Sequence, residues 1–202
     1  MKRLSWLALG ASLLAAGAAA QVTPAAPPPI VRGVVTQVRP GALIVKAKGG
    51  KLVTVGLAAA WTVSVMKSIG IDAIRPGSFI GTAEMPQADG TGRSLEVHIF
   101  APGVKMGEGH YAWDLRPRSM MTNGTVGKVA AGRRGQELDV AYPTGTRHLV
   151  VPAHVPIVQI TAGDRAQVKP GVAVFMIVAP AAGGGLTAGA VAIGEGGKAP
   201  PM

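Results

Sequence analysis

The sequence predicts an all-β protein in which two small β-barrels follow one another along the chain, after an N-terminal signal peptide. Glycine (29 residues) and proline (16 residues) are frequent, and only 15% of the residues are charged. This composition favours many short strands and turns over long helices. Short runs of β-branched residues end in turn residues, and the order of these runs occurs twice. The apolar content of 48% is sufficient for a hydrophobic core in a chain of 202 residues.

The first twenty residues are typical of a secretory signal peptide. Lys2 and Arg3 precede an apolar run over residues 4–16, and the alanines at 18–20 supply the small side chains that signal peptidase requires. We therefore expect residues 1–20 to be removed before Gln21 and the protein to be periplasmic or secreted. The alternative is an uncleaved membrane anchor, which the short, glycine-interrupted run disfavours. No later run is long and apolar enough for a spanning helix, so we do not expect the chain to span the membrane after cleavage.

Flexible segments are expected at both ends of the mature chain. Residues 22–29 carry four prolines, a density that excludes a helix or a central strand. We therefore expect residues 21–29 to form an extended Pro-rich tether. Residues 196–202 are expected to form a flexible tail.

The first repeat is expected over residues 30–100. Turns such as Lys48-Gly49-Gly50-Lys51 and Arg75-Pro76-Gly77 separate its β-branched runs. Residues 67–74 are the stretch that also has a helical interpretation. The expected strands are residues 30–38, 42–47, 52–55, 61–66, 78–84 and 94–100.

The second repeat is expected over residues 122–195. Residues 123–129 resemble residues 32–38 at an offset of 91, and Lys169-Pro170-Gly171 corresponds to Arg75-Pro76-Gly77 at an offset of 94. This order is what a duplication produces, and the alternative is coincidence among Gly-rich and Val-rich runs. The expected strands are residues 122–129, 136–141, 147–151, 156–160, 172–178 and 186–193.

The size of each repeat predicts its architecture. A unit of about seventy residues with roughly five or six strands suits a small closed barrel of the oligonucleotide/oligosaccharide-binding (OB) type better than an immunoglobulin-like sandwich. Closure also removes free sheet edges, which matters for valine-rich and isoleucine-rich strands. The prediction is therefore two tandem OB-like β-barrels. The alternative is a single larger β-sandwich built from both repeats.

The chain resembles a set of uncharacterised exported bacterial proteins with tandem small β-barrel domains of unknown function. The resemblance covers nearly the whole mature chain and rests on Gly33-Val34-Val35, Gly49-Gly50, Arg75-Pro76-Gly77, Gly124-Thr125-Val126, Lys169-Pro170-Gly171 and residues 113–117 and 119–123. Such proteins are often labelled metal ABC transporter permeases by automatic annotation. A permease needs several spanning helices, and the sequence after the signal has no run suited to one. The resemblance implies the fold and export, and it brings no catalytic or binding residues.

The segment between the repeats, residues 101–121, is the candidate site, because it breaks the repeat and gathers aromatic and charged side chains. The candidate binding residues are Tyr111, Trp113, Asp114, Arg116 and Arg118. In one interpretation Tyr111 and Trp113 anchor a protein partner. In the other the two aromatic side chains fill the seam between the barrels, and Asp114 pairs with the two arginines in an ordinary turn.

The same segment carries soft metal ligands. The candidates are Met106, His110, Met120 and Met121, whose thioether and imidazole groups suit copper in a chain without cysteine. Their spacing matches no established metal motif, and methionine also fills irregular gaps in a core. Copper is therefore the one cofactor considered, as an alternative to none.

Enzyme motifs are missing from the sequence, including the Gly-x-Ser-x-Gly elbow, His-Glu-x-x-His and the phosphate loop. We therefore expect no enzyme. Glu96 and His98 share one face of an expected strand and could bind a proton or a metal, although solvated neighbours are commoner. An enzymatic alternative requires Glu96, His98 or His154 to meet another acid in a deep pocket.

The charge balance bears on partners. Without Lys2 and Arg3 the chain has eighteen basic and ten acidic residues. Export argues against nucleic acid as a partner, and the scattered aromatic residues offer no base-stacking platform. The expected partner is an envelope protein or an anionic envelope surface, and the alternative is that the charge only maintains solubility. The predicted function is an exported, non-enzymatic binding or scaffolding protein of the bacterial cell envelope. A periplasmic copper-handling accessory protein is the alternative.

Overall fold

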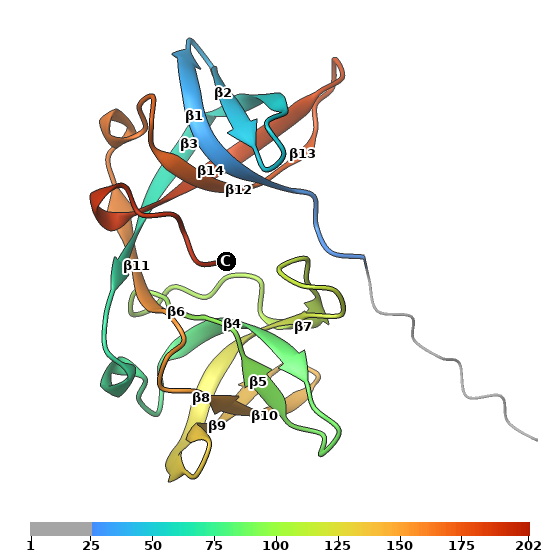
Figure 1. The fold of residues 1–202 in the computed structure, drawn as a ribbon, viewed down its shortest axis with the longest axis vertical. Helices are drawn as coiled ribbons and strands as arrows, with labels where there is room; N and C mark the ends of the chain where they lie inside the picture. Colours follow the sequence, from blue (N-terminus) through green and yellow to red (C-terminus); the bar gives the residue numbers. More distant parts are fainter. Residues whose placement is uncertain (1–25) are drawn as a thin grey trace, which may run out of the picture.

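The structure, a computed structural model, describes residues 26–202 and is all-β, as the sequence predicts (Figure 1). The predicted signal peptide and residues 21–25 of the tether lie outside the described residues. The strands are β1 (Ile30–Arg39), β2 (Ala42–Ala47), β3 (Leu52–Ser68), β4 (Phe79–Pro86), β5 (Gly92–Ser94), β6 (Val97–Ile99), β7 (Gly109–Ala112), β8 (Met120–Gly132), β9 (Gly135–Tyr142), β10 (Gly145–Val151), β11 (Ile157–Gly163), β12 (Ala173–Ile177), β13 (Ala179–Pro180) and β14 (Leu186–Gly194). Three short 3-10 turns are η1 (Ile71–Ala73), η2 (Arg165–Gln167) and η3 (Glu195–Gly197).

Five strands close into a barrel, which we call the first ring. β1 pairs antiparallel with β2, and β2 with β3. β3 pairs in parallel with β14, β14 pairs with β12, and β12 returns to β1.

A second circuit of pairings, which we call the second ring, joins β4, β8, β9, β10 and β5. β4 pairs with β8, β8 with β9 and β9 with β10. β10 then pairs in parallel with β5, which returns to β4. β6 pairs with both β4 and β11, and β7 pairs with β8. Figure 1 shows the two rings one above the other, with β3 and β11 passing between them on one side.

Each ring contains strands from both predicted repeats. The first ring combines β1–β3 with β12 and β14, and the second combines β8–β10 with β4 and β5. This corrects the prediction that residues 30–100 and residues 122–195 each form a barrel from their own strands. Each ring takes strands from both predicted repeats, an arrangement we call the exchange of strands, and it follows from the course of β3. β3 continues as one strand through residues 56–60, where the sequence predicts two strands at 52–55 and 61–66. Those residues, Gly-Leu-Ala-Ala-Ala, contain no turn-forming pair, so the chain leaves the first ring without reversing.

The registers of the two rings correspond. Gly33 faces Val174 in the first ring, and Gly124 faces Ile80 in the second. Gly33 and Gly124 are 91 residues apart in the sequence, and their partners Ile80 and Val174 are 94 residues apart, which are the two offsets of the predicted repeat. Both glycines allow a close approach, because a Cβ at Gly33 would overlap the carbonyl of Lys46 and one at Gly124 the carbonyl of Ala141.

Two other local expectations differ from the structure. The expected strand at 94–100 is divided into β5 and β6, because Leu95 and Glu96 leave the ladder between them. Residues 67–74 form no α-helix, since Lys67 and Ser68 still belong to β3 and only the three-residue turn η1 follows.

The apolar side chains form three clusters of buried residues. One fills the first ring around Leu43 and Val191, and a second fills the other ring around Ile80 and Leu149. The third lies between the rings and includes Trp113, Met121 and Phe175, together with five further buried residues, Met66, Ala83, Val158, Ala192 and Met202. The two rings therefore share a continuous apolar contact.

The C-terminal segment packs against the body, which corrects the expectation of a flexible tail at residues 196–202. Met202 is 8% exposed and belongs to the third cluster. Its backbone carbonyl accepts a hydrogen bond of 2.7 Å from Arg32 Nε. Burial of this side chain offsets the entropy that ordering the segment costs.

None of the segments within residues 26–202 is a helix with the length and apolarity to cross a bilayer.

Candidate ligand-binding cavity and buried polar network

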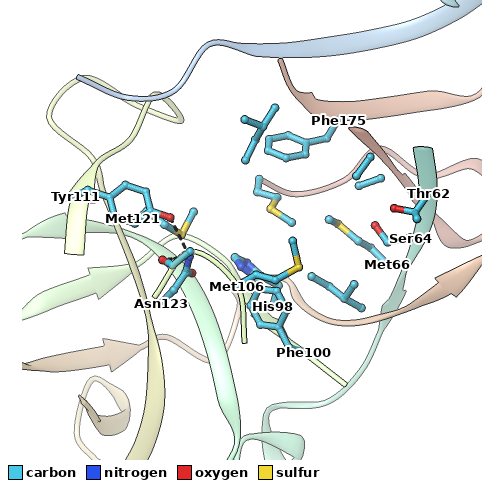
Figure 2. Close-up of a pocket in the computed structure, with 16 residues that line it drawn as sticks. Thr62, Ser64, Met66, His98, Phe100, Met106, Tyr111, Met121, Asn123 and Phe175 are labelled. Carbon is cyan, nitrogen blue, oxygen red and sulfur yellow. Dashed lines mark hydrogen bonds between the residues drawn. The ribbon is translucent and has the colours of Figure 1, made fainter. Parts of the chain in front are cut away.

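A cavity of about 330 Å³ lies between the two rings (Figure 2). β3, β12 and β14 contribute to its wall from one side, and β6, β7 and β8 from the other. Most of the wall is apolar, and the polar side chains on it are Thr62, Ser64, His98, Tyr111 and Asn123. A mainly apolar hollow with a few polar groups is typical of a small-molecule binding site.

Four methionines line this cavity. Met66 lies on β3, Met121 on β8, Met106 in the loop between β6 and β7, and Met202 in the C-terminal segment. Met106 is 60% exposed, and the other three are buried. Figure 2 shows Met66, Met106 and Met121 around the same space as His98. Four methionines from separate segments therefore line one cavity.

His98 is the buried polar anchor of the cavity. Its Nδ1 donates a hydrogen bond of 3.0 Å to Glu96 Oε2, and the side chains of His98 and Glu96 are 4% and 0% exposed. The second carboxylate oxygen of Glu96 accepts a hydrogen bond of 2.7 Å from the backbone N–H of Ala83. Because Glu96 engages Nδ1, it fixes the orientation of the imidazole. Nε2 lies beside Gly81 and Asn123 Oδ1, at the edge of the cavity that His98 and Asn123 line.

Asn123 lies next to this imidazole. Its Nδ2 donates hydrogen bonds of 2.9 Å to the carbonyl of Gly107 and to the hydroxyl of Tyr111. Its Oδ1 is buried and has no hydrogen-bond partner among the described residues. A Cβ at Gly81 would overlap both Asn123 Oδ1 and the ring of His98, so glycine at this position creates the room for the two polar groups.

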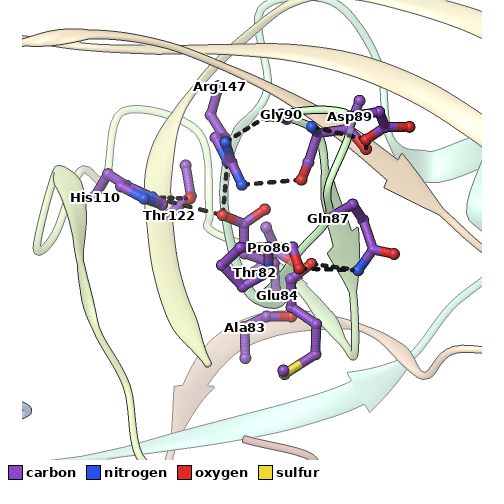
Figure 3. A network of polar contacts seen from close by, with 12 residues as sticks. Thr82, Ala83, Glu84, Pro86, Gln87, Asp89, Gly90, His110, Thr122 and Arg147 are labelled. Carbon is purple, nitrogen blue, oxygen red and sulfur yellow. Dashed lines mark hydrogen bonds and ion pairs between the residues drawn. The ribbon is translucent and has the colours of Figure 1, made fainter. Parts of the chain in front are cut away.

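A separate polar network lies in the second ring, around Glu84 (Figure 3). Glu84 is fully buried, and its Oε1 accepts a hydrogen bond of 2.7 Å from Arg147 Nε. The guanidinium also donates to the carbonyls of Gly90 and Thr91 at 2.8 and 3.1 Å. The carboxylate occupies the position that a Cβ of Gly92 would take. Arg147 therefore ties the turn before β5 to the ring through one buried charge pair.

His110 borders this network. Its Nδ1 shares a hydrogen bond of 2.8 Å with the hydroxyl of Thr122 and lies 3.6 Å from Glu84 Oε1. The ring stacks on Tyr142 with centroids 6.1 Å apart. Burial raises the pKa of Glu84 above its ordinary value, and the charge and hydrogen bond of Arg147 oppose this shift. Burial lowers the pKa of His110, and the charge of Arg147 adds to that shift.

The two aromatic candidates of the sequence lie at the seam. Trp113 is 5% exposed, its ring centroid lies 6.3 Å from that of Phe175, and its Nε1 has no hydrogen-bond partner among the described residues. Tyr111 is partly buried, lines the cavity and has its ring edge toward Trp113 at 6.3 Å. Burial raises the pKa of the Tyr111 hydroxyl. Trp113 is thus placed to join the rings rather than to reach a partner.

The charged candidates of the segment behave differently. Asp114 pairs with Arg32 of β1, through hydrogen bonds of 2.8 and 2.7 Å from the two terminal guanidinium nitrogens. The expected pairing of Asp114 with Arg116 and Arg118 does not occur, because Asp114 is turned toward the first ring. Arg116 and Arg118 are exposed, and Arg118 has a left-handed backbone with a φ of 65°.

The four expected metal ligands are divided between two places. Met106 and Met121 line the cavity, whereas His110 belongs to the network around Glu84. Met120 precedes Met121 on β8 and does not line the cavity, because neighbouring strand residues point to opposite faces. Within residues 26–202, no three His, Asp or Glu side chains are grouped so that they could hold a metal ion. The set of Met106, His110, Met120 and Met121 therefore does not form one site.

Sequence reasoning missed several features of the cavity. Met66 and Met202 lie far from the inter-repeat segment, and no local motif signals that they reach it. The sequence places Glu96 and His98 on one strand face and predicts that both are solvated, whereas both are buried. The available signal was Gly81, on a neighbouring strand: a glycine inside a β-branched strand indicates a close approach by another group.

No protein-family model, curated protein or solved structure matches the chain. The fold and the site together define an all-β protein with a closed five-strand barrel and a ligand-sized cavity against it.

Proposed function

We propose that this protein is an exported, non-enzymatic binding protein of the cell envelope that holds a small, mainly apolar ligand in the cavity between its rings. The observation that carries the proposal is the cavity itself, which combines an apolar wall with one buried, oriented imidazole. Buried polar groups cost free energy unless they are satisfied, so an Asn123 Oδ1 without a partner at the wall favours a ligand with a hydrogen-bond donor.

The volume limits the ligand. About 330 Å³ is near the lower end of the range for small-molecule sites. The ligand is therefore a compact molecule with one polar end, which His98 and Asn123 orient, and an apolar part against the methionines and Phe175.

Export is proposed from the sequence of residues 1–20, which has the three regions of a signal peptide. The N-terminal sequence of the protein isolated from a periplasmic or secreted fraction tests this part. A mature chain that begins at Gln21 is expected. An intact N-terminus in a cytoplasmic fraction would contradict it.

The finer description of the fold is also part of the proposal. We propose that both rings are OB-like barrels that arose by duplication and exchanged their last strands. The support is the register: Val55 faces Leu186 in the first ring and Leu149 faces Gly92 in the second, and the sequence offset of 94 relates the two pairs. Coincidental Gly-rich runs would not reproduce the register of parallel pairs.

The partner is proposed to be an envelope protein or an anionic envelope surface. The exposed Arg116 and Arg118 lie in the connecting segment that also carries the cavity residues Met106 and Tyr111, and they add positive charge to this segment. Nucleic acid is not proposed as a partner, because an exported protein does not meet it.

A fluorescent apolar probe, N-phenyl-1-naphthylamine, tests the cavity in the full chain. We expect saturable binding with a fluorescence increase, and the loss of both in Ala190→Phe, whose side chain would fill the cavity. The matched control is Ala59→Phe at an exposed position of β3 outside the cavity wall, and it should bind like the unaltered chain. Equal binding by both variants would refute the assignment of the site.

A second candidate function is the handling of a copper-type cation by a periplasmic accessory protein. Two of the expected soft ligands, Met106 and Met121, line the cavity together with Met66, Met202 and His98, and this gathering favours it.

A further inference from the structure

We infer that the cavity also binds a soft monovalent cation of the copper(I) type, held by His98 Nε2 and by thioethers of Met66, Met106, Met121 and Met202. This inference rests on the second candidate function, since it names the cation and the residues that would hold it in the same cavity.

The first argument is the chemistry of the wall. Thioether and imidazole are soft and intermediate ligands, and thioethers select copper(I) over harder divalent cations. Methionine as a filler of core gaps accounts for buried side chains, but Met106 is 60% exposed and still lines the cavity. An exposed methionine at the mouth of a cavity with three buried ones provides a soft ligand on the entry path.

The second argument is the support of the histidine. In metal sites the ligating imidazole usually donates its other N–H to a carboxylate, which orients the ring and raises its basicity. His98 Nδ1 donates to Glu96 Oε2 at 3.0 Å, and the backbone N–H of Ala83 donates to the other oxygen of the Glu96 carboxyl group and holds it in place. The arrangement is buried and in place at the edge of the cavity, so a cation would meet a preoriented Nε2.

The third argument is charge. The carboxyl group of Glu96 lies behind His98, and it is fully buried. A divalent cation would bring more charge into this apolar cavity than one carboxyl group can balance, so the wall favours a monovalent cation. Residues 26–202 also offer no group of three His, Asp or Glu side chains, which zinc and harder cations would require.

Titration of the full chain with copper(I), without oxygen and against the chelator bicinchoninate, tests affinity and stoichiometry. We expect one copper(I) per chain and no competition from zinc(II). Glu96→Gln should weaken binding by about 10–100-fold, the range for loss of a supporting carboxylate. His98→Gln and the double change Met66→Leu with Met121→Leu should weaken it at least as much. The control Met176→Leu changes a buried methionine outside the cavity and should bind normally.

The location is tested with methyl-labelled methionine and silver(I), a redox-stable substitute for copper(I), by recording the methyl NMR resonances of the full chain. This reading does not depend on whether the variants are stable. We expect the methyl resonances of the cavity methionines to shift, namely Met66, Met106, Met121 and Met202. The methyl resonances of Met85, Met120 and Met176 should not shift. Equal shifts in both groups, or shifts only in the second, would overturn the inference.

The outcomes separate this inference from the proposed function. Binding of N-phenyl-1-naphthylamine without stoichiometric copper(I) binding overturns the inference and leaves the cavity as a site for an apolar ligand. Binding of neither overturns both. Copper(I) that displaces the probe from the cavity supports both.

Discussion

Replacement of Arg147 by methionine should destabilise the protein strongly, because it leaves the carboxylate of Glu84 buried without its positive partner. The guanidinium makes three hydrogen bonds, at 2.7 Å to Glu84 and at 2.8 and 3.1 Å to two backbone carbonyls. Breaking a buried pair by removing one partner costs about 3–5 kcal/mol. This is a large part of the roughly 5–15 kcal/mol by which a folded domain is stable.

The assay is urea unfolding of the full chain, followed by tryptophan fluorescence, at pH 7 and at pH 5. Arg147 lowers the pKa of Glu84, so its removal raises that pKa further. In the variant Glu84 is then neutral over a wider range of pH, and the loss of stability should be smaller at pH 5 than at pH 7. Glu84→Gln combined with Arg147→Met should recover part of the loss at pH 7.

The matched control is Arg134→Met. Arg134 pairs with Asp89, which lies on the turn that Arg147 also contacts, and both side chains of this pair are exposed. Thr91 and then Arg134 lower the pKa of Asp89 to about 2, but both side chains are in solvent, so little change in stability is expected. If Arg147→Met costs no more than Arg134→Met at pH 7, the buried charge pair does not contribute as argued.

Three further predictions concern the seam, the histidine and the exchange of strands. Trp113→Ala should cost about 3–5 kcal/mol in urea unfolding while leaving one transition, because the indole packs between the rings; two separated transitions would contradict this role. The pKa of His110 is lowered in the folded protein, so between that pKa and 6.5 the unfolded chain binds more protons and the free energy of unfolding decreases as the pH falls. The variant His110→Gln should therefore lose less stability than the unaltered chain between pH 7.5 and 5.5. An unchanged pH profile would argue against the buried imidazole. Residues 26–121 and 122–202, prepared separately, should show no cooperative unfolding by circular dichroism and should recover it when mixed, whereas independent folding of either would contradict the strand exchange.

The strands were predictable because their signals are local. β2 has the boundaries that the pattern at 42–47 predicts, and Leu43 and Val45 point inward as the alternation requires. The glycine and proline turns also lie where the sequence places them. The pairing was not predictable in the same way, because strands 79–86 and 173–177 have the same local pattern whichever ring they join.

The cavity could be predicted only in part. Met106, Tyr111 and Met121 lie in the inter-repeat segment, where the break in the repeat drew attention to them. Met66 and Met202 reach the cavity only because β3 runs between the rings and the C-terminal segment folds back. A motif search depends on sequence spacing, and these residues are brought together by the exchange alone.

The position of the cavity explains why the repeat itself does not reveal it. β3 and β11 pair antiparallel between the rings. At the sequence offset of 94, Met66 corresponds to Ile160, and both residues line the cavity. The same offset places His98 on Ala192 and Gly81 on Phe175. A Cβ at Gly81 would overlap the ring of His98, whereas position 175 carries a phenyl ring. A search for repeated residues therefore passes over His98 and Gly81, because the residues 94 positions later, Ala192 and Phe175, are of different size and chemistry.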